Sequence, residues 1–222
     1  MRFLPILFAY TAVVFANTEK TVFKAPISTV VVDGRPGFED LRLDTLSPTR
    51  STLRLTVPVV FPTEEHPSGL DSWFLLHGLE PERQYEVRVC WAAVQPTAVT
   101  VDTFNISHVF DTPELITSLA TFSERQSPKE LQQSNIWLAK DYRSSILFLR
   151  VQSAADFFTS AKELMQNPPA VEIDIILDPY IANLLPSSTV SIVGFVATLA
   201  VAGWVVSGVI SKRLHLDKER TD

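Results

Sequence analysis

The chain has 222 residues, and 19 Lys and Arg against 25 Asp and Glu leave a net charge of −6 at pH 7. Nucleic-acid-binding proteins concentrate Lys and Arg where they contact the phosphate backbone. This chain is acidic and has no such cluster, so nucleic-acid binding is excluded as its function class. The same charge balance argues against peripheral binding to anionic lipid.

The first sixteen residues, MRFLPILFAYTAVVFA, have the features of a secretory signal peptide. Arg2 provides a basic start, and the apolar stretch that follows is too short to span a bilayer. Val14 and Ala16 occupy the −3 and −1 positions of a cleavage site. We therefore expect residues 1–16 to be removed and the mature chain to begin at Asn17.

Residues 17–178 are predicted to form one mainly β luminal domain, an antiparallel β-sandwich of the fibronectin III or immunoglobulin type with minor helices. Apolar residues alternate with period two in 51–60, 84–93 and 170–179, which is typical of half-buried strands. Further strands are expected at 20–26, 28–33, 71–76, 98–104 and 144–152.

The stretch GLEPERQYEVRVCW, residues 78–91, resembles the tyrosine corner of fibronectin type III and related sandwiches. In those folds the Tyr precedes a central strand, and its hydroxyl returns to the backbone. We expect Leu79, Tyr85 and Trp91 in the core, with Glu86 and Cys90 on the opposite face. Because Cys90 is the one cysteine of the sequence, it is expected as a shielded free thiol rather than in a disulfide with another chain.

The strand pattern fades in two places. Residues 112–135 predict one or two short helices or a long insertion. In 154–169, Ala154, Phe158, Ala161 and Met165 recur near helical spacing, and this helix is expected to stop at Pro168.

After a juxtamembrane linker at 179–189, residues 190–210 carry no charge. Twenty-one helical residues extend roughly 31 Å, enough to cross a ~30 Å hydrocarbon layer. Lys212 and Arg213 begin a cytoplasmic tail, 211–222, as the positive-inside rule requires of a single-pass type I protein. The alternative, a buried helix of a soluble protein, requires protein on every side of an all-round apolar surface.

Small residues form two stripes on this helix, one containing Gly194 and Thr198 and the other Gly203 and Ser207. Such stripes let helix backbones approach closely in lipid and predict packing against a multi-spanning partner, although membrane helices are rich in small residues in any case. In the tail, Lys218 and Arg220 resemble the basic retrieval signals that return type I proteins to the endoplasmic reticulum.

The sequence offers no recognisable catalytic set. His66, His77 and His108 lack metal-ligand spacing. Alternation places Glu172, Asp174 and Asp178 on one strand face, where we interpret them as a solvated surface, with Asp178 turning away before Pro179. We therefore predict no catalytic, cofactor-binding or metal-binding residue. The sequon at Asn105 predicts N-glycosylation.

The mature start NTEKTVF, the acidic β-rich body, DIILDPYIANLLP at 174–186 and the C-terminal span resemble the fungal accessory subunit of GPI mannosyltransferase II. The resemblance implies a non-catalytic protein of the endoplasmic reticulum membrane. Its partner would be the multi-spanning catalytic subunit that adds the second mannose to the GPI precursor.

Two other classes of function stay open. A type I cargo receptor of the early secretory pathway has a similar layout, but such receptors resembling the p24 family carry a luminal cysteine pair and a long heptad helix. A glycan-acting luminal enzyme would need its acid–base residues on the acidic strand around Glu172 and Asp174.

Overall fold

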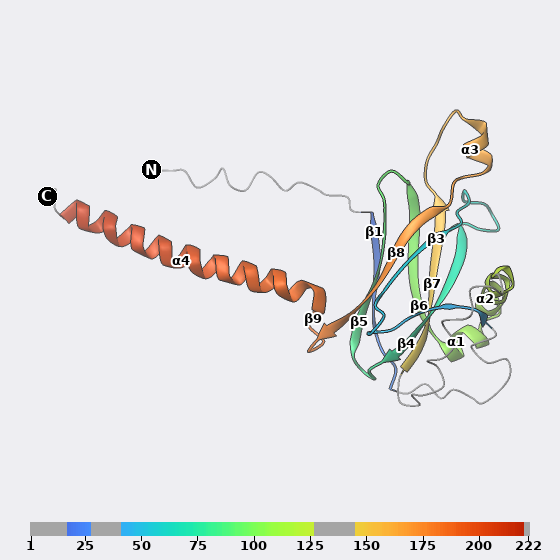
Figure 1. Cartoon of the computed structure of the whole chain (residues 1–222), viewed down its shortest axis with the longest axis horizontal. Helices are drawn as coiled ribbons and strands as arrows, with labels where there is room; N and C mark the ends of the chain where they lie inside the picture. Colours follow the sequence, from blue (N-terminus) through green and yellow to red (C-terminus); the bar gives the residue numbers. More distant parts are fainter. Residues whose placement is uncertain (1–16, 28–40, 127–144, 220–222) are drawn as a thin grey trace.

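The computed structural model describes residues 17–27, 41–126 and 145–219. Two β-sheets pack against each other (Figure 1) and share one apolar core. The expected signal peptide and the strand expected at 28–33 lie outside the described residues.

The first sheet has the order β1-β5-β8-β3, with β9 paired to β8. Its strands are β1 (Thr18–Lys24), β5 (Gln84–Trp91), β8 (Val171–Ile181), β3 (Thr52–Val57) and β9 (Leu185–Pro186). The second sheet has the order β2-β4-β7-β6. Its strands are β2 (Asp44–Leu46), β4 (Leu70–Leu79), β7 (Ser145–Ala155) and β6 (Thr97–Asn105). The named strands pair antiparallel except β2 with β4, so the predicted mainly β, antiparallel class is confirmed.

The core between the sheets contains the residues that alternation placed inward. Val87 and Val89 of β5 pack with Ile173 and Ile175 of β8, and all four are buried. Tyr85 is fully buried, and the Glu80 N–H donates a hydrogen bond of 2.9 Å to its hydroxyl oxygen. This bond confirms the predicted tyrosine corner.

Trp91 corrects the prediction that both aromatic residues of this strand are buried. It is only partly buried and packs against the edge of the core, because it is the last residue of β5.

Two helices cover the outer face of the second sheet and create a smaller second core. They are α1 (Ile106–Asp111), which was not predicted, and α2 (Pro113–Arg125), which confirms a helix in 112–135 as far as Arg125. Trp73 of β4 is fully buried beneath α2, and its Nε1 donates to Ser118 Oγ at 2.9 Å. Both faces of the middle of β4 are covered, and residues 73–76 there are a continuous apolar run rather than an alternating one.

The helix predicted from Ala154 onward is largely wrong. Ala154 and Ala155 are buried in β7, where they pair with Ala98 and Thr97 of β6. Helical structure in this region is limited to the short α3 (Lys162–Gln166). The small apolar alanines fit the strand pairing as well as a helix face, and tertiary pairing decided between the two.

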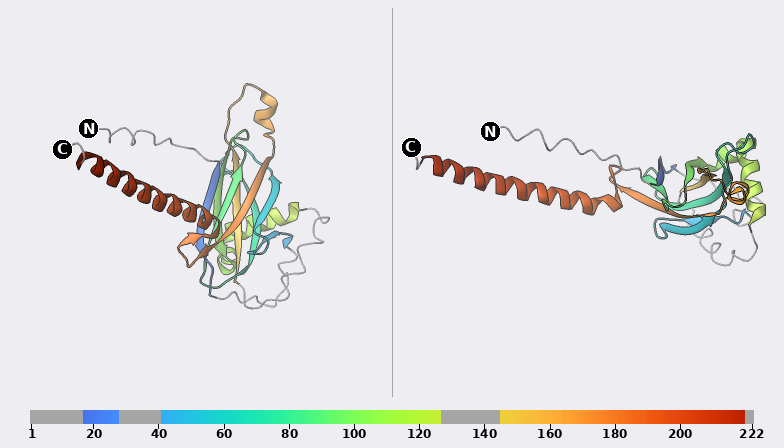
Figure 2. Two further views of the ribbon diagram at one scale, coloured as in Figure 1. Left: turned by 60° about the vertical axis from the view of Figure 1, so that its left-hand side comes forward. Right: turned by 90° about the horizontal axis from the view of Figure 1, so that it is seen from above.

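Beyond β9, the 3₁₀ turn η3 (Ser187–Thr189) leads into α4 (Val190–Glu219), which projects away from the sandwich in Figures 1 and 2. Within residues 187–212, an 18-residue window has a mean hydropathy of 2.1, and none of that window is buried against the body. A helix that is apolar on all sides and uncovered by protein fits a membrane span.

Tyr85→Ala is expected to lower the free energy of unfolding by about 3–5 kcal/mol, because it removes a large buried ring. Tyr85→Phe removes only the bond from Glu80 and is expected to cost about 1 kcal/mol. Chemical denaturation of the full chain in detergent, followed by tryptophan fluorescence, measures both values. An unchanged midpoint for the alanine variant would mean that this strand does not present Tyr85 to the core.

Candidate functional site at the base of the membrane helix

The connection from the sandwich to α4 is a structured hairpin. Leu184 N–H donates to Ile181 O at 3.0 Å, and the two central residues have positive φ, 52° for Ala182 and 56° for Asn183. Positive φ at both positions matches the turn type that follows the right-handed twist of paired strands. A left-handed backbone is unfavourable for Ala182, so surrounding contacts must hold the turn.

Asn183 provides such contacts to the turn between β4 and β5. Its Oδ1 accepts a bond of 2.9 Å from the Gln84 N–H, and its Nδ2 donates to Glu82 O at 3.3 Å. Arg83 Nε donates a hydrogen bond of 3.0 Å to the carbonyl oxygen of Tyr180 in β8. An open groove lies between these two turns, and the hairpin is fixed to the body on both sides of it.

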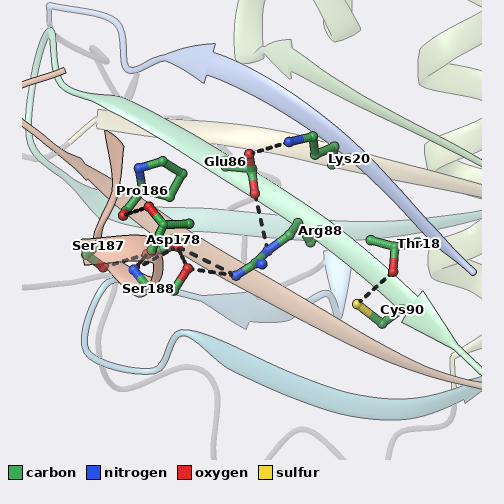
Figure 3. Close-up of polar contacts among 10 residues, drawn as sticks. Thr18, Lys20, Glu86, Arg88, Cys90, Asp178, Pro186, Ser187 and Ser188 are labelled. Atoms are coloured by element: carbon green, nitrogen blue, oxygen red, sulfur yellow. Dashed lines mark hydrogen bonds and ion pairs between the residues drawn. The ribbon is translucent and has the colours of Figure 1, made fainter. Parts of the chain in front are cut away.

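The carboxylate of Asp178 ties η3 back to β8. It accepts hydrogen bonds from the hydroxyls of Ser187 and Ser188 and from the Ser188 N–H, the last at 3.2 Å (Figure 3). The residue is only 4% exposed. The interpretation of Asp178 as a solvated residue that turns away is therefore wrong, because η3 folds over the outer face of the sheet and covers it.

A second carboxylate, Glu86, lies directly opposite Asp178 in the β5–β8 register and is 3% exposed. Like charges at opposed positions repel, so the pair needs cations between or beside them. Arg88 supplies one, with Nε 3.2 Å from Glu86 Oε1 and Nη2 3.6 Å from Asp178 Oδ2. Lys20 of β1 supplies the other, 3.1 Å from Glu86 Oε2. Figure 3 shows the four side chains as one network across three strands.

Burial alone would raise the pKa of Asp178, but the hydrogen bonds from Ser187 and Ser188 and the charge of Arg88 hold this pKa below its usual value. The carboxylate is therefore ionised near neutral pH. A buried charge with this many partners favours one geometry for the segment that leads into α4.

The other two residues of the acidic strand do not join this network. Asp174 pairs with Arg54 of β3 through two bonds of 2.6 and 2.7 Å, and these bonds lower the pKa of Asp174. Glu172 is exposed. Asp174 and Asp178 are four residues apart along the strand, about 13 Å, too far to share an ion.

The described residues contain no group of three or more side chains suited to hold a metal ion. His77 lies in β4, where burial, with a smaller effect of Arg50, lowers its pKa. His108 lies in α1 and packs on Phe104 with ring centroids 5.8 Å apart.

Cys90, on the outer face of the first sheet, is a half-buried free cysteine whose sulfur accepts a hydrogen bond from Thr18 Oγ1 at 3.5 Å.

The predicted packing residues of α4 are exposed, as expected of a span without lipid or partner. A Cβ built on Gly194 or Gly203 meets no atom within 4 Å, so the fold of this chain does not itself require glycine there. Thr198 Oγ1 donates to Gly194 O at 2.9 Å, which satisfies its hydrogen within the helix. Packing of Gly203 and Ser207 against a partner stays a prediction.

Two predicted surface signals have different places in the structure. Asn105 is exposed at the end of β6 and makes no side-chain capping bond to α1, so its amide is accessible. Lys218 falls within the bounds of α4, while Arg220 lies outside the described residues, and their role in retrieval stays a prediction.

Sequence reasoning missed the network of Lys20, Glu86, Arg88 and Asp178. Alternation did place Glu86 and Arg88 on one face of β5, but that pattern does not distinguish a solvated face from a covered one. The missing information was the pairing of two strands that are far apart in the sequence.

Comparison of the chain with known proteins identifies its family. Residues 7–127 match the model of the Pga1 family, described as GPI-mannosyltransferase II co-activator, and this match covers more than half of the chain. The chain belongs to this co-activator family. The resemblance inferred from the sequence is thereby confirmed, and neither the cargo-receptor nor the enzyme alternative gains support.

A curated relative agrees with the family assignment. A GPI mannosyltransferase 2 subunit of Schizosaccharomyces pombe is 24% identical over 123 residues, which cover 55% of this chain and 46% of that protein. The chain thus spans about half the length of the relative. No solved structure matches it. The family match ends before β8, so Lys20, Glu86 and Arg88 lie within it and Asp178 lies beyond it.

Asp178→Asn is expected to lower the free energy of unfolding by about 2 kcal/mol, because the charged acceptor of several bonds is lost. Since the folded-state pKa is lowered, the stabilisation is present above the unfolded pKa of about 3.9 and is lost as the pH falls through the lower folded value. Denaturation of the full chain between pH 3 and 7 measures this, and the difference from wild type should shrink below about pH 4.

The matched control is Asp174→Asn, which removes an exposed ion pair with Arg54 and should cost about 0–1 kcal/mol. Equal effects of the two substitutions would contradict a special role for the buried carboxylate.

Proposed function

We propose that this protein is a non-catalytic accessory subunit that binds the multi-spanning catalytic subunit of GPI mannosyltransferase II in the endoplasmic reticulum membrane. That enzyme would add the second mannose to the GPI precursor. The observation that carries the proposal is the family match over residues 7–127. The relative from Schizosaccharomyces pombe, itself described as a subunit of GPI mannosyltransferase 2, supports it.

The chemistry of the described side chains fits an accessory role. The acidic residues best placed for acid–base work are already engaged, Asp174 by Arg54 and Asp178 by Ser187, Ser188 and Arg88. A general base needs a free lone pair directed at a substrate, and these carboxylates direct theirs at the protein.

A subunit of this kind acts by binding. A protein that binds the folded enzyme and not its unfolded form stabilises it by mass action. In our proposal α4 packs on the enzyme in the membrane through Gly203 and Ser207, or through Gly194 and Thr198 on the other face.

The proposed topology is type I. Residues 1–16 are removed as a signal peptide, residues 17–178 form the luminal domain, and 179–189 connect it to a span at 190–210. Residues 211–222 then form the cytoplasmic tail, with Lys212 and Arg213 next to the membrane.

Gly203→Leu with Ser207→Leu is expected to reduce co-purification with the mannosyltransferase several-fold in mild detergent, because the bulk prevents close helix approach. A precursor carrying one mannose should then accumulate in a lipid-linked precursor profile.

The control adds bulk between the two small-residue stripes, with Phe195→Trp and Val206→Leu, and should leave the complex intact. Glu172→Gln with Asp174→Asn should also leave the pathway running. If the carboxylate variant alone stopped mannose transfer while the complex stayed intact, the accessory role would be wrong and a catalytic one would replace it.

Asn105→Gln is expected to abolish one glycan, because the exposed sequon would lie in the lumen in the proposed orientation. Endoglycosidase treatment of the wild-type protein should give the same gel mobility as the variant. Ser107→Ala, which destroys the sequon and keeps Asn105, should behave identically. A wild-type protein that carries no glycan at Asn105 would remove the support that this site gives to a luminal body.

A further inference from the structure

The tip of the β8–β9 hairpin exposes a group of large apolar side chains. Ile181 is 47% exposed, Leu184 76% and Leu185 43%. They fall within five consecutive residues, and neither sheet nor any described helix covers them. A folded protein rarely leaves such a group in water unless something else covers it.

The position of the tip indicates what covers it. Figures 1 and 2 both place the hairpin at the end of the sandwich from which α4 leaves. The apolar helix begins at Val190, only five residues after Leu185, with η3 between them. With about 3.3 Å per residue in β9 and about 2 Å per residue in η3, Leu185 lies within roughly 13 Å of the start of α4 along the chain. The interfacial layer on each side of a bilayer is about 5–8 Å deep.

The hairpin is held in this place. Asn183 binds backbone atoms of Glu82 and Gln84, and Asp178 binds Ser187 and Ser188 on the far side of the tip. These contacts fix the hairpin with respect to the sandwich and to η3, the turn that leads into α4. The apolar tip therefore does not depend on a flexible linker to reach the bilayer.

The rim of the tip has the charge pattern expected at the headgroup level. Behind the apolar residues, Glu82 pairs with Lys24 at 3.1 Å, and Glu80 pairs with Arg83. Ion pairs next to exposed apolar side chains are compatible with the hydrated headgroup region of a bilayer.

We propose that Ile181, Leu184 and Leu185 insert into the lipid interface of the leaflet from which the sandwich emerges. The hairpin is then a second membrane contact, beside the helix, that fixes the tilt of the sandwich over the bilayer. The occupant of this surface is lipid, because the tip is continuous with the span. The inference rests on α4 crossing the membrane and is independent of the mannosyltransferase partner.

The test places a fluorescent probe at the tip of the full chain. Cys90→Ser gives a cysteine-free background in which serine still accepts the bond from Thr18. Leu184→Cys is then labelled with a polarity-sensitive NBD group, and the protein is reconstituted alone into phosphatidylcholine vesicles that contain nitroxide lipids. Leu185→Cys is a second reporter should the first variant fail to fold.

Two labelled positions calibrate the result. Val94→Cys lies in the turn at the opposite end of β5 and is 87% exposed, so its probe should stay in water. Val196→Cys lies in the span and should be quenched by nitroxides deep in the acyl chains. We expect the Leu184 probe to show blue-shifted emission and to be quenched several-fold more by nitroxides near the headgroup than the Val94 probe.

Two outcomes would overturn the proposal. If the Leu184 probe matches Val94 in vesicles, the tip is in water. If it becomes shielded only when the mannosyltransferase is reconstituted with it, the tip is covered by protein and not by lipid. Either result would leave co-purification with the enzyme unaffected, so the accessory role is tested separately.

Discussion

The burial of Asp178 determines how the sandwich is joined to the apolar helix α4. A carboxylate removed from water must receive hydrogen bonds or a counter-charge, and Asp178 receives both, from Ser187, Ser188 and Arg88. Two of these donors belong to η3, so satisfying the charge folds the chain back onto β8 immediately before α4 begins. Glu86, on the opposed position of β5, requires Arg88 to serve two carboxylates and brings in Lys20 from β1. The turn that leads into α4 is thus connected through side chains to three strands of one sheet.

Much of the first sheet could be predicted from the sequence, because β3, β5 and β8 each turn one side to the core and period-two alternation reports that directly. Tyr85 illustrates this, since the Leu-x-Pro and Tyr spacing indicated both its burial and the bond that its hydroxyl accepts. The prediction was wrong where small residues fit both the strand period and the helix period, as at Ala154, which lies in β7 and not in a helix. The junction was not predictable in the same way. Whether Glu86 and Asp178 are solvated depends on strand pairing and on the cover that η3 provides, neither of which leaves a local signal.

The outer faces of the two sheets differ in composition and in what covers them. The outer face of the second sheet is apolar and is covered by α1 and α2, with Trp73 and Phe148 buried beneath them. The outer face of the first sheet is polar and charged, and η3 covers only the part around Asp178. The family match includes α1, α2 and the strands that supply Lys20, Glu86 and Arg88, and it stops before the strand that supplies Asp178. Three of the four network residues therefore lie in the matched part of the chain, and Asp178 lies in the part that carries α4.

A rigid junction changes what a binding subunit can achieve. If the sandwich hung from a flexible linker, contacts made by α4 in the membrane would raise the local concentration of the sandwich at its own binding surface only modestly. With Asp178 and Asn183 fixing the body to the start of the helix, the ordering entropy of the second contact is largely removed in advance. The conformational freedom that binding would otherwise remove has already been lost in folding, and the strained backbone at Ala182 is one local cost of that arrangement. In the proposed role, the protein would influence the enzyme through differences in binding free energy between states of that enzyme. In the proposed complex, a connection held by Asp178 and Asn183 would favour the state of the enzyme in which the sites that contact the sandwich and α4 are both correctly placed.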